Sequence, residues 1–153
     1  MPASLSGSCL CGAIRYTISA PLSSPLGELR ACHCTHCQKT SGAGGSVNLP
    51  IATDSFKITQ GTPKRYAAKA DSGRTLYRFF CAGCGSPIYS QRESNPALVV
   101  VRAGTLDNAG DMKITAHIWT GSKRDRICSW CCCEQQTCRE GQHNRLFRHC
   151  RSP

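Results

Sequence analysis

The sequence predicts a single, mainly β domain that is cross-linked by metal ions. Three observations carry this prediction: short segments alternate apolar and polar side chains, no window of about eleven residues shows a helical stripe, and 13 of the 153 residues are cysteine. The hydrophobic fraction of 40% includes those cysteines, and without them it falls to roughly 31%. A core this thin is expected to need cross-links in addition to hydrophobic burial.

The clearest strand is predicted over residues 13–19, where Ile14, Tyr16 and Ile18 share one face and polar side chains share the other. Further short strands are predicted for a segment that runs from residue 28 into the cysteine cluster at 32–37, and for residues 46–50, 56–59, 74–80, 98–102 and 114–119. Residues that favour turns separate these segments. We expect at most one helical turn, near residues 105–108.

The composition changes at Lys123, which divides the chain into a domain over residues 1–122 and a tail over residues 123–153. The tail holds six of the cysteines, is rich in basic residues and shows no alternation of strand length. So little apolar surface cannot offset the entropy of ordering the segment, so we expect a disordered or poorly packed, Cys-rich tail. Its cysteine and histidine spacings are irregular and do not predict a third metal site.

The net charge of +10 raises the question of a nucleic-acid partner. The 19 basic residues are scattered, with no run longer than a pair, and zinc thiolate sites would lower the charge to about +7. A solvated surface explains this charge better than a nucleic-acid interface. The first residues show no secretory signal, and no apolar run is long enough to span a membrane. We therefore expect a cytoplasmic protein, with the nucleus as the alternative and no membrane contact.

In a reducing compartment, clustered cysteines indicate metal ligands rather than disulfides. Seven cysteines form three clusters in the predicted domain: Cys9 and Cys11, then Cys32, Cys34 and Cys37, then Cys81 and Cys84. A C-x-C pair on a strand offers both sulfurs on one side, and a C-x-x-C pair forms a tight turn around an ion. Seven ligands suit one closed site of four and one open site of three. The spacing alone leaves the pairing undecided, since Cys34 and Cys37 could also join Cys81 and Cys84.

Four segments resemble the glutathione-dependent formaldehyde-activating enzyme (GFA) family, also called the CENP-V/GFA domain. The segments read GSCLCGA at residues 7–13, CHCTHCQKTSGA at 32–43, FCAGCG at 80–85 and AGTLD at 103–107. The resemblance covers roughly residues 5–122 and implies an Mss4-like β fold with two zinc ions per chain. It implies that Cys9, Cys11, Cys81 and Cys84 hold a structural zinc. Cys32, Cys34 and Cys37 would hold a catalytic zinc that keeps one coordination place open.

The same resemblance implies a zinc-dependent carbon–sulfur lyase or synthase that resembles S-(hydroxymethyl)glutathione synthase. Its substrates would be a small thiol such as glutathione and an aldehyde. Zinc with an open place can bind the thiol, lower its pKa and hold the thiolate beside an electrophilic carbon. The alternative is a non-catalytic zinc module that contacts protein or nucleic acid. The three-cysteine set favours the enzyme, because a purely structural module needs no open site.

Several polar and aromatic residues near these motifs have ordinary structural interpretations. His33 and His36 lie between the cysteines and are expected to be structural or solvated rather than ligands. Asp107 is expected to cap the helical turn. His117 and Trp119 alternate with an isoleucine and are expected to pack in the last strand.

Overall fold

The computed structural model describes residues 4–19, 27–70, 72–109 and 112–124. In this part of the chain the prediction of a mainly β domain is confirmed, since ten strands form two sheets. Residues 125–153, which make up most of the predicted tail, lie outside the described residues, so the disorder expected there stays a prediction. No helix within the described ranges is long and apolar enough to cross a membrane.

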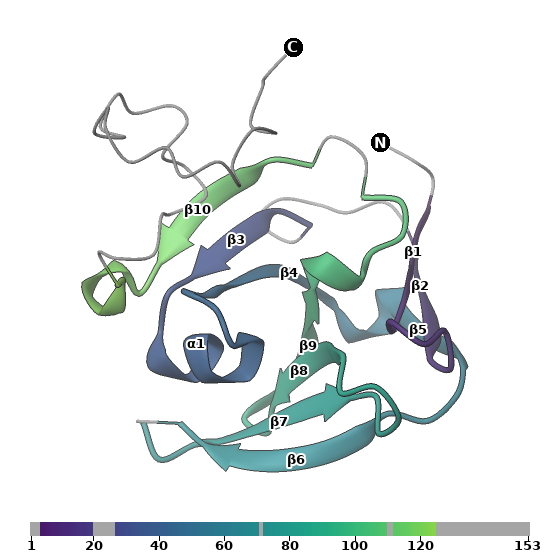
Figure 1. Ribbon diagram of the computed structural model, residues 1–153, viewed down its shortest axis with the longest axis horizontal. Coiled ribbons are helices and arrows are strands. Elements are labelled where there is room, and N and C mark those ends of the chain that lie inside the picture. The colour runs from purple at the N-terminus through teal and green to yellow at the C-terminus, as the bar shows by residue number, and fades with distance from the viewer. Residues whose placement is uncertain (1–3, 20–26, 71, 110–111, 125–153) are drawn as a thin grey trace, which may run out of the picture. The chain divides into compact units, whose positions relative to one another are not determined.

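The larger sheet has seven strands. In spatial order they are β10 (Ile114–Ile118), β3 (Leu29–Cys32), β4 (Ser46–Ala52), β9 (Asn95–Arg102), β8 (Pro87–Arg92), β7 (Thr75–Phe80) and β6 (Lys64–Lys69). Figure 1 shows them following one another from β10 at the top to β6 at the bottom. Neighbouring strands are antiparallel, except that β10 runs parallel to β3.

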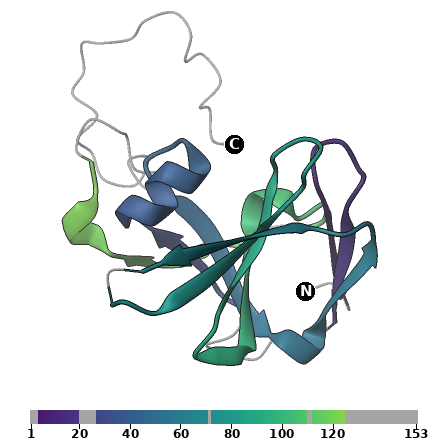
Figure 2. The same cartoon turned by 90° about the horizontal axis from the view of Figure 1, so that it is seen from below.

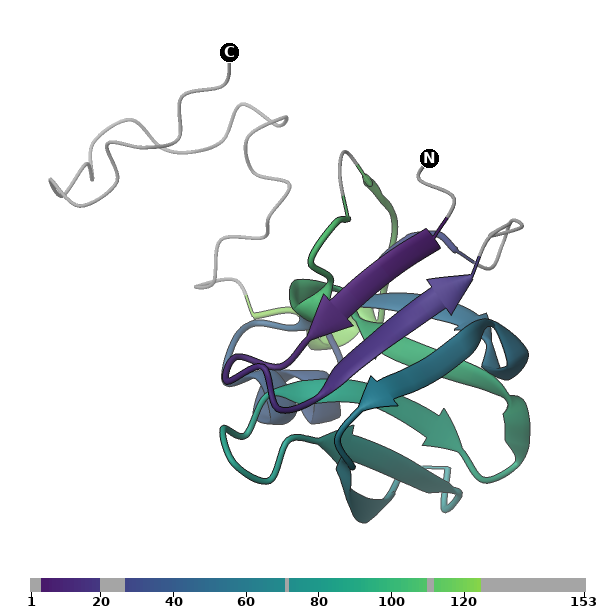
Figure 3. The ribbon, with the colours of Figure 1, turned by 90° about the vertical axis from the view of Figure 1, so that its right-hand side faces the viewer.

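The smaller sheet is antiparallel and has the order β1 (Ser4–Ser8), β2 (Arg15–Ser19) and β5 (Phe56–Gln60). Figure 3 shows these three strands side by side, with the purple β1 and β2 joined by a short loop. The alternation predicted for β2 is confirmed, because Tyr16 and Ile18 are buried while Arg15 and Thr17 are exposed. One face of this sheet is therefore apolar and packs into the core.

A series of aromatic rings connects the two sheets. Tyr16 of β2 packs against Phe56 at a centroid distance of 5.2 Å, and Phe56 packs against Tyr89 of β8 at 4.8 Å. Tyr89 in turn stacks on Phe79 of β7 at 4.2 Å. The core around these rings is formed by Leu5, Ile14, Ile18, Leu29, Leu49, Ile51, Ile88, Val99 and Val101. Both sheets thus contribute apolar side chains to one core.

The helix α1 (Thr35–Ser41) was not predicted, so the expectation of at most one helical turn, near residues 105–108, was wrong. With seven residues it is too short to show a helical stripe in the sequence. Cys34 caps its start by accepting a hydrogen bond from the backbone of Cys37 at 3.4 Å, and Gly42 ends it in the left-handed conformation at φ 66°. Figures 1 and 2 show α1 on one side of β9 and the β1–β2 hairpin on the other.

Short 3₁₀ helices form at η1 (Thr53–Ser55), η2 (Ala103–Thr105) and η3 (Thr120–Ser122). The expected turn near residues 105–108 overlaps η2 only at its last residue. Asp107 does not cap it, and instead accepts a hydrogen bond from Ser8 Oγ at 2.8 Å. The packing expected of Trp119 was also wrong: this residue follows β10, adopts φ 59° and is 64% exposed.

Candidate metal centres

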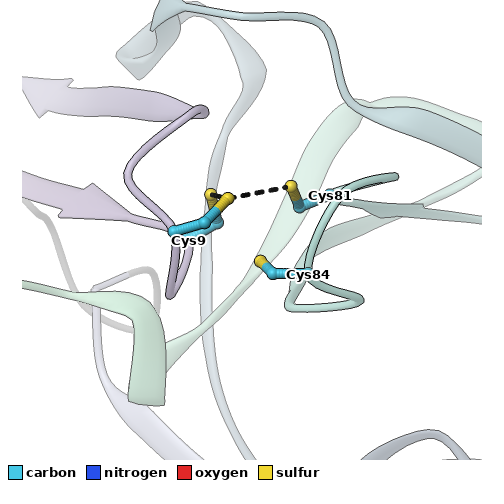
Figure 4. Close-up of side chains that lie close together, drawn as sticks. Cys9, Cys81 and Cys84 are labelled. Atoms are coloured by element: carbon cyan, nitrogen blue, oxygen red, sulfur yellow. Dashed lines mark hydrogen bonds between the residues drawn. The ribbon is translucent and has the colours of Figure 1, made fainter.

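Four of the predicted ligands meet where two loops approach each other. Cys9 and Cys11 lie in the loop between β1 and β2, and Cys81 and Cys84 lie in the loop between β7 and β8. All four sulfurs lie within 4.8 Å of one another. Figure 4 shows the sulfurs of Cys9, Cys81 and Cys84 turned toward a common centre. We call these residues the four-cysteine cluster; it joins the smaller sheet to the larger one.

The geometry of the four-cysteine cluster suits a zinc ion. The sulfur of Cys11 lies 3.5 Å from that of Cys9 and 3.7 Å from that of Cys81. A tetrahedron of sulfurs around zinc, with bonds of about 2.3 Å, requires sulfur separations of about 3.8 Å. A disulfide would require about 2.05 Å, and all seven cysteines of the described residues are free thiols. The donor set and its spacing therefore fit a closed, structural type of zinc site.

Hydrogen bonds hold the ligands of this cluster in place. The backbone of Ile14 donates to Cys9 Sγ at 3.2 Å. Ser86 Oγ lies 3.2 Å from Cys84 Sγ and accepts a hydrogen bond from the backbone of Leu10 at 3.0 Å, so it bridges the two loops. Bonds from the side chain and backbone of Ser86 lower the pKa of Cys84 to about 5. The thiolate form that a metal requires is favoured at this position.

The other three predicted ligands meet at the start of α1. Cys32 ends β3, Cys34 caps the helix and Cys37 lies in its first turn, and their sulfurs lie within 4.8 Å of one another. We call them the three-cysteine cluster. No fourth Cys, His, Asp or Glu ligand joins them among the described residues. The alternative pairing of Cys34 and Cys37 with the late C-x-x-C motif is not what the structure forms.

The two buried thiols of the three-cysteine cluster differ in acidity. The hydrogen bond from Cys32 lowers the pKa of Cys37, against the effect of burial, and Ser46 and the charge of Arg102 lower it further. The same hydrogen bond, with burial, raises the pKa of Cys32. Arg102 Nη1 lies 3.9 Å from Cys37 Sγ and is a donor to that sulfur. Cys37 is therefore the position where negative charge is most strongly stabilised.

Sequence reasoning missed a set of polar residues behind the three-cysteine cluster. Strand register places Cys32 opposite Ser46, and Asn48 opposite Arg102, and side chains two residues apart on β4 share a face. Arg102 donates to Ser46 Oγ at 2.5 Å and to Asn48 Oδ1 at 2.6 Å. The alternation of Ser46 and Asn48 could be read from the sequence, but the pairing that brings Arg102 to them could not.

The histidines do not join either cluster. His33 is 8% exposed and its Nε2 lies 3.0 Å from His117 Nδ1, with the two rings stacked. This agrees with the structural role expected of His33. Gln38 of α1 donates from Nε2 to the carbonyl oxygens of His33 and Ser122, at 2.7 Å each. The helix is thereby tied to the residue that follows β3 and to the last residue of η3.

Comparisons with known proteins identify a family whose sequences and fold resemble those of this chain. The model of a family described as "Glutathione-dependent formaldehyde-activating enzyme" matches residues 4–122. A Halomonas elongata protein named "Putative glutathione-dependent formaldehyde-activating enzyme" is 34% identical over 109 residues, which is 68% of this chain. The match covers 66% of that relative, slightly less than two thirds of its length. The crystal structure of a Rhodobacter sphaeroides protein matches with a TM-score of 0.56 and 21% identity, over 73% of this chain and 98% of that one. The last similarity supports the fold alone.

Proposed function

This chain belongs to the glutathione-dependent formaldehyde-activating enzyme family, and from that premise we propose that it is a zinc-dependent carbon–sulfur lyase or synthase. Its substrates are glutathione, or a similar small thiol, and an aldehyde. With formaldehyde the product is S-(hydroxymethyl)glutathione, and the reverse reaction cleaves the carbon–sulfur bond. Since the family match ends at residue 122, we assign this activity to the domain over residues 1–122.

The observation that carries the proposal is the unequal size of the two cysteine clusters. The four-cysteine cluster offers the complete ligand set of a structural zinc, and the three-cysteine cluster offers one ligand fewer. Zinc sites that bind substrate keep three protein ligands and one exchangeable place. We therefore assign the structural zinc to Cys9, Cys11, Cys81 and Cys84, and the catalytic zinc to Cys32, Cys34 and Cys37.

The proposed reaction forms one carbon–sulfur bond and involves no redox change. The thiol first loses its proton to solvent, and a zinc ion held by Cys32, Cys34 and Cys37 would supply the positive charge that stabilises the thiolate. The sulfur then attacks the carbonyl carbon of the aldehyde, the carbon–oxygen π bond breaks, and the oxygen takes up a proton. The cysteines hold the ion, and Arg102 supports the charge on Cys37 from the side of β9.

The proposal is tested by elemental analysis and by NMR exchange spectroscopy on the full chain. We expect two zinc ions per chain, and faster exchange between formaldehyde and glutathione in the presence of the protein than in buffer. Cys37→Ser is expected to keep the structural zinc and lose the acceleration. Two bound zinc ions without any acceleration, together with tight and salt-sensitive binding of nucleic acid, would instead support the non-catalytic module.

A further inference from the structure

Two buried arginines lie beside the three-cysteine cluster, and we call Arg78 and Arg102 the arginine pair. Arg78 is 9% exposed and Arg102 is 8% exposed. Arg78 Nη1 and Arg102 Nη2 both donate to Thr40 Oγ1 of α1, at 3.5 Å each. Guanidinium groups stay protonated in proteins. The pair therefore brings two permanent positive charges to the helix that carries Cys37.

The strand register places the arginine pair on the same face of the larger sheet as Cys32. Ser90 of β8 lies opposite both Val100 of β9 and Arg78 of β7. Val100 and Arg102 are two residues apart on β9, so their side chains share a face. Cys32 lies on this face too, because it is paired with Ser46 and directly paired residues of neighbouring strands share a face. The cysteine and both arginines therefore belong to one polar face, on which α1 lies.

Within the described part of the chain, neither arginine is paired with a carboxylate. The partners of Arg102 are the neutral oxygens of Ser46, Asn48 and Thr40 and the sulfur of Cys37. Burial lowers the pKa of Arg78, and the charge of Arg102 lowers it further, while the charges of the three cysteines act in the opposite direction. A buried charge is costly unless an opposite charge compensates it. The compensating negative charge is that of the three-cysteine cluster, whose sulfurs are thiolates when a metal ion is bound.

The charges of the cluster and the pair do not balance when a divalent ion is bound. Three thiolates and one Zn²⁺ sum to a formal charge of −1, and the arginine pair contributes +2. One further anion at the cluster brings the sum to zero. A neutral ligand, such as water or an amine, leaves one positive charge uncompensated in a buried environment.

We propose that the arginine pair makes the three-cysteine cluster select an anionic fourth ligand, so that the substrate thiol is held there as a thiolate in preference to a neutral molecule. The inference rests on the proposed function and specifies the charge state in which the substrate binds. The thiol proton leaves to solvent. Arg102 is a positioning residue in this account, because it contacts Cys37 Sγ, and Arg78 acts through its charge.

The test measures ligand affinity rather than turnover. The full chain is loaded with Co²⁺, and its visible absorption is titrated at fixed pH with 2-mercaptoethanol, with imidazole and with glutathione. Mercaptoethanol carries no carboxylate and binds as a thiolate, and imidazole binds as a neutral ligand. Arg74→Gln is the matched control, since Arg74 is exposed directly before β7 and its loss also removes one charge.

We expect Arg78→Gln and Arg102→Gln to weaken mercaptoethanol binding by about tenfold, the effect typical of one unit charge a few ångströms from an ionised group. In the same two variants, the affinity for imidazole should change by less than about twofold. The control Arg74→Gln should change the affinities for mercaptoethanol and imidazole by less than about twofold as well. Arg78→Lys, which keeps the charge, should restore most of the mercaptoethanol affinity. If Arg102→Gln fails to fold, the inference is tested by comparing the mercaptoethanol affinities of Arg78→Gln and Arg78→Lys.

Four results would overturn the inference. Unchanged mercaptoethanol affinity in Arg78→Gln would show that the charge does not act on the sulfur. A loss confined to glutathione would show that the pair binds a substrate carboxylate instead. Equal losses for mercaptoethanol and imidazole would indicate a distorted site. A wild-type protein that binds one Co²⁺ instead of two would contradict the proposed function as well, whereas two bound ions without any catalysis would leave the charge selection standing.

Discussion

The sulfurs of Cys11 and Cys81 lie 3.7 Å apart although 70 positions separate them in the sequence. The contact joins the β1–β2 loop of the smaller sheet to the β7–β8 loop of the larger sheet. An ion held by the four-cysteine cluster would therefore close a long loop of chain, which is where a cross-link has its largest entropic effect. Ser86 strengthens the same junction by bonding to both loops.

Cys81→Ser tests the structural role of this junction. Removing one of four ligands leaves an incomplete site, so we expect loss of one metal ion per chain and a decrease in the free energy of unfolding of about 3 kcal/mol or more. Thermal or urea unfolding, with elemental analysis of the folded protein, measures both effects. A well-folded Cys81→Ser protein that retains two zinc ions would contradict the assignment of Cys81 as a ligand.

Gly45→Ala tests the close packing behind the three-cysteine cluster. A methyl group at Gly45 would lie 2.5 Å from the carbonyl oxygen of Cys32 and 3.4 Å from His33 Nδ1. Because the first neighbour is backbone, we expect β3 to shift and the stability to fall by about 1–3 kcal/mol. Gly104→Ala is the control, since nothing lies within 4 Å of its added methyl group. Equal unfolding midpoints for the two variants would show that Cys32 tolerates the displacement.

Gln38→Leu tests how α1 is attached to the sheet. The substitution removes the donor to the carbonyl oxygens of His33 and Ser122 at similar side-chain volume, and we expect it to cost about 2 kcal/mol. Gln60→Leu is the control, because Gln60 is exposed and also donates to a backbone carbonyl, that of Gly12. Both variants are compared by urea unfolding. A smaller decrease in the free energy of unfolding for Gln38→Leu than for Gln60→Leu would contradict the role given to Gln38.

The sequence was sufficient to predict the strands in which apolar and polar side chains alternate. It was also sufficient to identify the cysteines that form the two clusters. β2, β4, β5, β7 and β9 lie within two or three residues of their predicted bounds or extend them. Three strands were missed: β1, whose five residues include a single large apolar side chain, β6, an edge strand with almost every residue exposed, and β8, which begins at a proline. Edge strands need no apolar face, so composition does not mark them.

The surroundings of the three-cysteine cluster could not be predicted for a different reason. Arg78 and Arg102 look like ordinary charged residues in the sequence, and their burial follows from the register between β7, β8 and β9. Strand pairing over such distances is a property of the fold and leaves no local pattern. The metal ligands could thus be recognised from sequence motifs. The buried arginines beside them could be identified only from the structure.

The central claim is that seven cysteines form one complete and one incomplete zinc site. Zinc stoichiometry in the purified wild-type and Cys37→Ser proteins, measured by elemental analysis with circular dichroism to verify folding, tests it most directly. We predict two zinc ions per chain in the wild type, and one in a Cys37→Ser protein that remains folded and no longer accelerates the exchange between formaldehyde and glutathione. A folded wild-type protein without zinc, or a Cys37→Ser protein with two zinc ions and full activity, would contradict the claim.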